Sequence, residues 1–318
     1  MKPLKLLFLY ITTSVMISSC VVQNEVIDHI DYTENTPFSL NQYVSSYDLW
    51  YVDYNSTTGT NEIPFLSKAF TVSFLNGNMY ANNNIVDIGK TGNGLGVLVG
   101  NYQANGSVLQ TNHTLDNQHD FEVIQLSENE IRIDDLHQNI SYFLTGYQKD
   151  NFDYDKLFYE NIEYLLQEYV AWEKIDENGG YENPFDTENF LQFTPENDVT
   201  FYSSHDFLGT NIDFIKWDYV GAYEIATIKG YNDLLLLTLN YNTNAIDSVE
   251  KFELKIINDQ TISLYHISSK TTYTFLGKGF IQHLRSNTKN TVNTAKNSVR
   301  NNSRKRTKIQ RKIVDKQN

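Results

Sequence analysis

The chain repeats a pattern of apolar and aromatic residues, and this repeat constrains its fold more than any other feature. When Phe121 is laid on Phe252, an offset of 131 residues holds without gaps to the end of the repeated stretch. The matched pairs include Ile131 with Ile262, Ile133 with Leu264, Tyr142 with Tyr273, and Gly146 with Gly277. Such self-similarity predicts two copies of one folding unit.

Upstream, an offset of 127 residues extends the repeat. It places Val72-Ser73-Phe74 on Val199-Thr200-Phe201, Tyr80 on Phe207, and Asn84-Ile85 on Asn211-Ile212, while Trp50 corresponds to Trp172. We therefore expect each unit to consist of a helix, a first strand that carries the tryptophan, and a sheet that curls or closes.

Local patterns identify the elements within each unit. Alternation such as Ile131-Arg132-Ile133-Asp134, with Asn-Gly pairs at 76–77 and 105–106, predicts about eight short hairpin-linked strands between residues 50 and 146. Thr36-Pro37 before Leu40, Tyr43, Val44 and Tyr47 predicts a short helix, and a period near 3.6 with Asp153 or Asp155 as cap predicts a second one over 155–170. The fold class is mainly β, with two tandem antiparallel barrels or curled sheets.

The first 19 residues are typical of an export signal, with Lys2 and Lys5 before an apolar stretch too short to span a membrane stably. Ile17-Ser18-Ser19-Cys20 resembles a lipobox, whose cysteine receives diacylglycerol and becomes the mature N-terminus. Cys20 is the only cysteine, which favours lipidation over an ordinary signal peptide and leaves no intramolecular disulfide. Residues 20–36 are polar and are expected to act as a tether.

Charge separates the body from the tail. Residues 285–318 contain 11 Lys or Arg and one acid, a net charge of +10, whereas residues 20–284 contain 12 basic and 38 acidic residues, a net of −26. The tail is expected to be a disordered basic tether for anionic envelope surfaces or for the acidic body, with a weak membrane-surface helix as the alternative. Because the chain is exported, no nucleic-acid partner is expected. The domains are then 37–150 and 151–284.

A helix that leads into a tryptophan-bearing first strand, followed by hairpins, resembles the lipocalin-like barrels of Bacteroidota lipoproteins. Over residues 1–284 the chain resembles a flavobacterial lipoprotein family with such β-domains. The resembling stretches are Ser46-Tyr47-Asp48-Leu49-Trp50-Tyr51-Val52-Asp53, Tyr80-Ala81-Asn82-Asn83-Asn84-Ile85-Val86, Phe152-Asp153-Tyr154-Asp155 and Glu188-Asn189-Phe190-Leu191-Gln192-Phe193.

That family is sometimes automatically named nicotinic acid mononucleotide adenylyltransferase. Such enzymes resemble one another in a His-x-Gly-His phosphate motif, and no two histidines of this sequence have that spacing. Ile267-Ser268-Ser269-Lys270 matches part of their second motif by letter, but it lies in a predicted β-hairpin. The name therefore has no support from these residues.

Other motifs fall short of a reaction centre. The string from Gly89 to Gly96 contains Gly-Lys-Thr, but the first glycine of a P-loop is replaced by Asn84. Ser203, Ser204, His205 and Asp206 are adjacent in sequence, so on a strand they alternate between faces rather than form a triad. Asp134, Asp135, Asp153 and Asp155 are candidate carboxylates for glycoside hydrolysis only because that chemistry needs a pair.

Metal binding also has little support in the sequence. The acidic loop with Asp176, Glu177, Asn178, Glu182, Asp186 and Glu188 could supply oxygen ligands for calcium, but an EF-hand register fails at Gly180, Tyr181 and Thr187. The seven histidines form no zinc motif. We expect no catalytic residue, metal or cofactor.

The function expected from these observations is that of a non-catalytic, membrane-anchored envelope lipoprotein. It would bind a small apolar ligand, a glycan or an envelope protein through residues that the sequence does not identify. A surface polysaccharide hydrolase with paired carboxylates is the alternative. An outer-membrane location is expected, with the membrane face and the oligomeric state left open.

Overall fold

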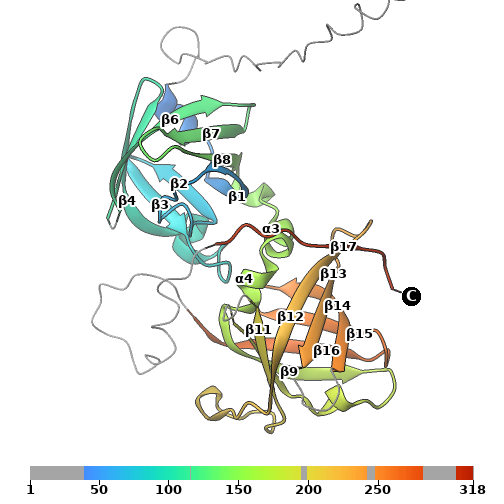
Figure 1. Cartoon of the computed structure of the whole chain (residues 1–318). Coiled ribbons are helices and arrows are strands. Elements are labelled where there is room, and N and C mark those ends of the chain that lie inside the picture. Colours follow the sequence, from blue (N-terminus) through green and yellow to red (C-terminus); the bar gives the residue numbers. More distant parts are fainter. Residues whose placement is uncertain (1–38, 115, 195–198, 242–247, 282–305, 318) are drawn as a thin grey trace, which may run out of the picture. The chain divides into compact units, whose positions relative to one another are not determined.

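The protein folds as two closed, eight-stranded antiparallel β-barrels with few helices, as the sequence predicts (Figure 1). The computed structural model describes residues 39–114, 116–194, 199–241, 248–281 and 306–317. The expected signal at 1–19, the tether at 20–36 and the lipidation site Cys20 lie outside these residues.

The first barrel follows sequence order around its ring. Its strands are β1 (Leu49–Gly59), β2 (Thr71–Leu75), β3 (Asn78–Asn82), β4 (Val97–Asn105), β5 (Val108–His113), β6 (Asn117–Gln125), β7 (Glu130–Asp135) and β8 (Ile140–Tyr147). Strand β8 pairs with β1 and closes the ring. At the Asn76-Gly77 turn between β2 and β3 both residues have positive φ, of 52° and 78°, which explains the Asn-Gly signal.

The second barrel has the same order. Its strands are β9 (Tyr169–Asn178), β10 (Phe190–Thr194), β11 (Thr200–Ser204), β12 (Tyr219–Ile228), β13 (Leu235–Tyr241), β14 (Ser248–Asn258), β15 (Thr261–His266) and β16 (Thr272–Phe280). Strand β16 pairs with β9, and β11 pairs with β12, so this ring is closed as well. A short strand β17 (Ile313–Val314) adds to β12 in parallel.

A short helix precedes the tryptophan strand of each barrel, as expected. Helix α2 (Leu40–Val44) leads into β1, and helices α3 (Tyr154–Glu160) and α4 (Ile162–Leu166) lead into β9. Asp153 caps α3, but the predicted continuous helix over 155–170 is broken at Asn161, whose φ of −126° is not helical. The cap of α2 is Ser39, which forms a capping box with Gln42.

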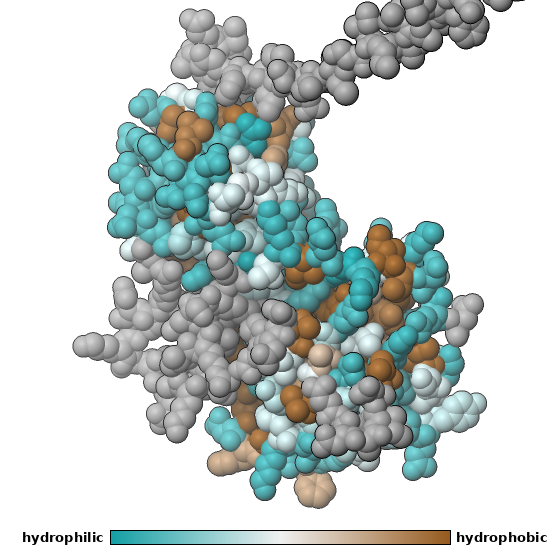
Figure 2. Space-filling model, in the orientation of Figure 1, coloured by the Kyte–Doolittle hydropathy of each residue, from teal (hydrophilic) through white to brown (hydrophobic). Residues whose placement is uncertain are grey.

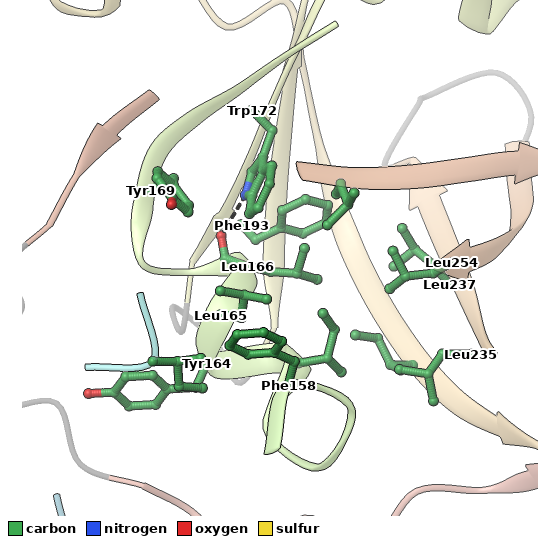
Figure 3. Close-up of a cluster of buried hydrophobic side chains, with 14 of the residues drawn as sticks. Phe158, Tyr164, Leu165, Leu166, Tyr169, Trp172, Phe193, Leu235, Leu237 and Leu254 are labelled. Carbon is green, nitrogen blue, oxygen red and sulfur yellow. Dashed lines mark hydrogen bonds between the residues drawn. The ribbon is translucent and has the colours of Figure 1, made fainter. Parts of the chain in front are cut away.

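The two tryptophans occupy equivalent positions. The indole nitrogen of Trp50 donates a hydrogen bond to the carbonyl of Val44 at 2.8 Å, and that of Trp172 donates to the carbonyl of Leu166 at 2.9 Å (Figure 3). Both rings are completely buried. Each tryptophan therefore ties the helix that precedes its barrel to the first strand.

The repeated glycines have the same role in both barrels. A Cβ atom added to Gly146 would lie 2.6 Å from the ring of Tyr47, and one added to Gly277 would lie 2.6 Å from the ring of Tyr169. Each tyrosine ring therefore lies directly on the glycine of the last strand, so the matched glycines are packing positions.

The downstream offset of 131 is confirmed, because Phe121 and Phe252 lie on the sixth strand of their barrels and are both buried. The upstream offset of 127 is wrong for the second strand. Val72 of β2 pairs with Trp50, whereas the residue opposite Trp172 is Leu191 of β10. The sequence comparison had matched β2 to β11, because short runs of apolar residues do not distinguish neighbouring strands.

The barrels share one apolar cluster. It contains side chains of the first barrel and its loops together with side chains of the second; among them are Leu49, Tyr51, Phe70, Ile85, Val86, Ile88, Ile162, Leu165, Tyr169, Trp172, Phe193 and Leu237. A separate cluster fills the rest of the first barrel. Figure 3 shows part of the shared cluster, where α4 meets the side chains of β10, β13 and β14.

The C-terminal segment differs from its sequence prediction. A disordered tail was expected over residues 285–318, yet residues 306–317 have defined contacts and include β17. Residues 285–305 lie outside the described part of the chain. Basic side chains of this segment pair with the acidic body, for example Arg311 with Glu163 at 2.6 Å. Residues 306–317 of the tail thus contact the chain's own acidic body.

Candidate functional site

Side chains fill the interiors of both barrels. One small cavity measures about 40 Å³ and is lined mostly by the loop after β3 and by Phe280. Another, inside the first barrel, measures about 10 Å³ and is lined by Phe65, Phe74, Met79 and neighbouring residues. Spaces of this size hold about one or two water molecules. Neither cavity is large enough for a small apolar ligand, which is one of the three binding partners that the sequence analysis considered.

A phenylalanine closes one end of the first barrel. Phe65, in the connection between β1 and β2, stacks on His113 with ring centroids 4.7 Å apart and meets Phe121 at 6.3 Å. The backbone nitrogen of Ile63 donates to the hydroxyl of Tyr142 at 2.9 Å and fixes this connection. The connection thus acts as a plug.

Phe185 closes the second barrel in the same way. It lies in a short 3-10 helix, Pro184–Thr187, between β9 and β10, and its ring is 4.6 Å from Phe252 and 5.0 Å from Tyr273. Asn183 caps this helix and also donates to the Tyr273 hydroxyl at 2.8 Å. The same loop position therefore supplies the plug in both barrels.

A buried carboxyl lies near the second plug. Glu188 accepts a hydrogen bond from the hydroxyl of Tyr241 at 2.7 Å, and it is 5% exposed. Burial raises the pKa of Glu188 to about 7, and the hydrogen bond from Tyr241 only partly offsets this effect. Glu188 is thus an internal titrating group, although the sequence offered it as a calcium ligand.

Two further acidic residues of this loop are also engaged within the fold. Glu177 pairs with Lys174 at 3.0 Å, and Asp186 accepts hydrogen bonds from Asn183 and from the Tyr273 hydroxyl. Among the described residues, no group of three or more histidine or acidic side chains could hold a metal ion. Local contacts therefore account for Glu177, Asp186 and Glu188.

The adjacent Ser203, Ser204, His205 and Asp206 do not assemble into a triad. Both serines are buried in β11, the ring of His205 lies 3.3 Å from the hydroxyl of Thr187, and Asp206 accepts from the backbone nitrogen of Lys216. The histidine and the aspartate therefore have separate partners.

The candidate carboxylates for hydrolysis have structural partners as well. Asp134 pairs with Arg132 at 3.0 Å, Asp135 with His119 at 3.0 Å, and Asp153 caps α3. Asp155 lies in the first turn of that helix. These positions belong to hairpins and helix ends rather than to one groove.

The loop between β3 and β4 is a docking element within the chain. The Glu168 carboxylate, at the start of the second unit, accepts hydrogen bonds from the backbone nitrogens of Ile85 and Val86 at 2.9–3.1 Å. Asp259 accepts from the nitrogen of Asp87 at 3.1 Å and pairs with Lys90 at 3.3 Å. The glycine-rich string therefore belongs to an interface between barrels.

The corresponding loop of the second barrel, between β11 and β12, is exposed instead. Phe207 is 89% and Phe214 74% exposed, and Leu208, Tyr219 and Val220 are exposed beside them. In Figure 2 apolar side chains protrude among hydrophilic ones at the lower end of this barrel. The upstream offset aligned Phe207 with Tyr80, but Tyr80 is a half-buried residue of β3, whereas Phe207 lies in this exposed loop. We call residues 207–220 the apolar loop.

Neighbouring contacts hold the apolar loop in a defined shape. Glu173 accepts from the backbone nitrogen of Gly209 at 2.5 Å, and Asp218 accepts from the nitrogen of His205 at 2.7 Å. A 3-10 turn, Ile212–Phe214, carries one of the exposed phenylalanines. Exposed aromatic side chains on a fixed loop are typical of interaction sites.

Comparison with models of protein families and with curated proteins finds no match. The fold thus defines the class by itself: two tandem lipocalin-like barrels with filled interiors, a class compatible with a binding module. Within the part of the chain that the structure describes, no helix is long and apolar enough to cross a membrane.

Proposed function

We propose that this protein is a non-catalytic envelope lipoprotein that binds another envelope protein through the apolar loop of its second barrel. The observation that carries the proposal is the contrast between equivalent loops. In the first barrel Ile85, Val86 and Ile88 are buried against the next unit, whereas Phe207 and Phe214 of the second barrel lie in solvent.

The filled barrels support binding at the surface rather than inside. A carrier of small apolar molecules needs an internal space of several hundred Å³, whereas buried side chains pack inside both barrels and two cavities found in the described residues measure only about 40 and 10 Å³. The exposed phenylalanines fit a protein partner better than a glycan, because the hot spots of protein interfaces are buried aromatic side chains.

Lipidation of Cys20 would place the binding surface at a membrane. Mass spectrometry of the detergent-extracted protein should show a diacylglycerol-modified N-terminal cysteine at position 20. A Cys20→Ser variant should leave the membrane fraction. Recovery of an unmodified protein that stays soluble would contradict the lipoprotein part of the proposal, including the outer-membrane location and the resemblance to flavobacterial lipoproteins.

The binding surface can be tested by site-specific photo-crosslinking in cells of the native host. A photoreactive residue at position 207 should give one dominant protein adduct, and the same residue at the exposed Leu136 of the first barrel should not. With the purified partner, replacing both Phe207 and Phe214 by serine should weaken binding by about tenfold or more. Equal crosslinking at both positions, or serine-sensitive binding to purified polysaccharide, would contradict a protein partner.

A further inference from the structure

The C-terminal segment, residues 306–316, contacts both barrels, and we call it the strap. Its first anchor is Arg306, which is 4% exposed. The guanidinium donates to the carbonyls of Val52 and Ala69 at 2.9 and 2.7 Å and to the side-chain oxygen of Asn161 at 3.3 Å. These acceptors come from β1, the connection before β2, and the break between α3 and α4.

Aromatic rings surround the same guanidinium. Its central carbon lies 4.5 Å from the ring centre of Phe70, 5.5 Å from that of Tyr54 and 5.9 Å from that of Tyr51. Burying a cation is costly unless polar atoms and ring faces replace its water. The side chain of Arg306 therefore lies in surroundings suited to a guanidinium.

Arg311 is the second anchor. It binds the Glu163 carboxylate with two nitrogens, at 2.8 and 2.6 Å, and donates to the carbonyls of Tyr159 and Glu160 at 2.6 and 3.2 Å. Those carbonyls belong to the last turn of α3, where helix carbonyls have no partner within the helix. A forked guanidinium satisfies the carboxylate and the carbonyls at once.

Beyond Arg311 the strap joins the second barrel. Ile313 and Val314 pair in parallel with Thr227 and Ile228 of β12, on the edge that β11 leaves open after Ala222. Lys316 then pairs with Glu253 at 3.4 Å. In Figure 1 the strap is the dark red trace that includes β17.

The acceptors for both arginines arise from the folding of earlier residues. Strands β1 and β2 pair only at Trp50 and Tyr51, so the carbonyl of Val52 lies where they separate. Helix α3 ends at Glu160, and its C-cap is Asn161. The acceptors therefore all belong to residues that precede the strap in the sequence and have places of their own in the fold.

We propose that these acceptors form a peptide-binding site for an extended segment with two arginines five residues apart, and that the strap is its resident, non-covalent ligand. The site recognises guanidinium groups through carbonyl and carboxylate oxygens, and it recognises the following two apolar residues through the edge of β12. This inference goes beyond the proposed function and does not depend on it.

The test uses the full chain with a protease site inserted within residues 282–305 and cut after folding. Native mass spectrometry should show that the released fragment stays bound to the body. A fluorescent peptide with the sequence of residues 304–317 should exchange with it. If the fragment dissociates as soon as the chain is cut, or the peptide never enters, the strap is not a ligand of a separate site.

Variant peptides separate specific recognition from charge, because the protein under test stays unchanged. Arg306→Gln in the peptide should weaken binding by about 30-fold or more, since a buried charged partner is lost. Arg306→Lys in the peptide should recover little of the lost affinity, because an ammonium group lacks the planar, forked donor arrangement of a guanidinium. Lys312→Gln removes an equal charge from an exposed pair with Glu224 and should change binding by less than about threefold. Equal losses for both glutamine variants would overturn the proposal.

Discussion

Glu188 shows how a single buried group makes stability depend on pH. Its pKa in the folded protein is about 7, above the value of 4.5 for an exposed glutamate. The folded state therefore binds the proton more tightly, so the contribution of Glu188 to stability is complete below pH 4.5 and is lost as the pH rises through 7. The difference between the two pKa values corresponds to about 3 kcal/mol.

Glu188→Gln should remove this dependence, because the amide oxygen still accepts from Tyr241 without carrying charge. We expect the variant to be more stable than the native protein at pH 8, by about 1–3 kcal/mol, and similar to it at pH 5. Urea denaturation at both pH values measures the effect. A variant that is destabilised equally at both would contradict the role of Glu188 as a buried titrating group.

Gly277 is a position where one added methyl group has no room. Gly277→Ala would place a Cβ atom 2.6 Å from the ring of Tyr169, and we expect a loss of about 1–3 kcal/mol in the free energy of unfolding. Thermal unfolding checks this value. Combining the substitution with Tyr169→Leu should cost less than the sum of the single changes, and strict additivity would argue against this contact.

At the scale of elements, the two plugs, which carry Phe65 and Phe185, fill one end of each barrel. Phe185→Ala should cost about 3–5 kcal/mol, because it removes a buried ring and leaves a cavity. Phe214→Ala, at an exposed position of the apolar loop, should change stability by less than about 0.5 kcal/mol. Denaturation of both variants gives the comparison. A small cost for Phe185→Ala would mean that the plug contributes little to closing the barrel.

The repeat allowed the two barrels to be predicted, because the pairs Phe121 and Phe252, Tyr142 and Tyr273, and Gly146 and Gly277 are packing positions that both units must keep. The plugs were missed, since nothing in the local sequence shows that Phe65 and Phe185 turn back into a barrel. The exposure of Phe207 was also missed, because the sequence alone does not show whether another part of the fold packs against a given phenylalanine.

The strap was outside the reach of sequence patterns for another reason. The basic residues of the tail predicted attraction to anions, and the chain's own acidic body was among the surfaces considered. The particular acceptors of Arg306 come from Val52, Ala69 and Asn161, which are brought together only by the complete fold. The basic composition of the tail predicts that it is attracted to acidic groups, but only the tertiary structure shows which residues it contacts.

At the scale of the whole molecule, the shared apolar cluster and Glu168 make the barrels depend on each other. The Glu168 side chain is fully buried, and its carboxylate accepts hydrogen bonds from two backbone nitrogens of the loop after β3, those of Ile85 and Val86. Glu168→Ala leaves those donors without partners, so we expect a loss of about 2–5 kcal/mol. Calorimetry should change from one unfolding transition to two. Two transitions in the native protein would contradict the coupling.

The positions of the three tryptophans have a spectroscopic consequence. Trp50 and Trp172 are sealed in matching apolar surroundings with their indole nitrogens bound, so their fluorescence should be blue-shifted and inaccessible to iodide. Trp217, half-buried in the apolar loop near Tyr202, should supply the emission that iodide quenches. A docked partner should shield this one fluorophore and leave the other two unchanged, so unlabelled protein can report occupancy of the loop directly.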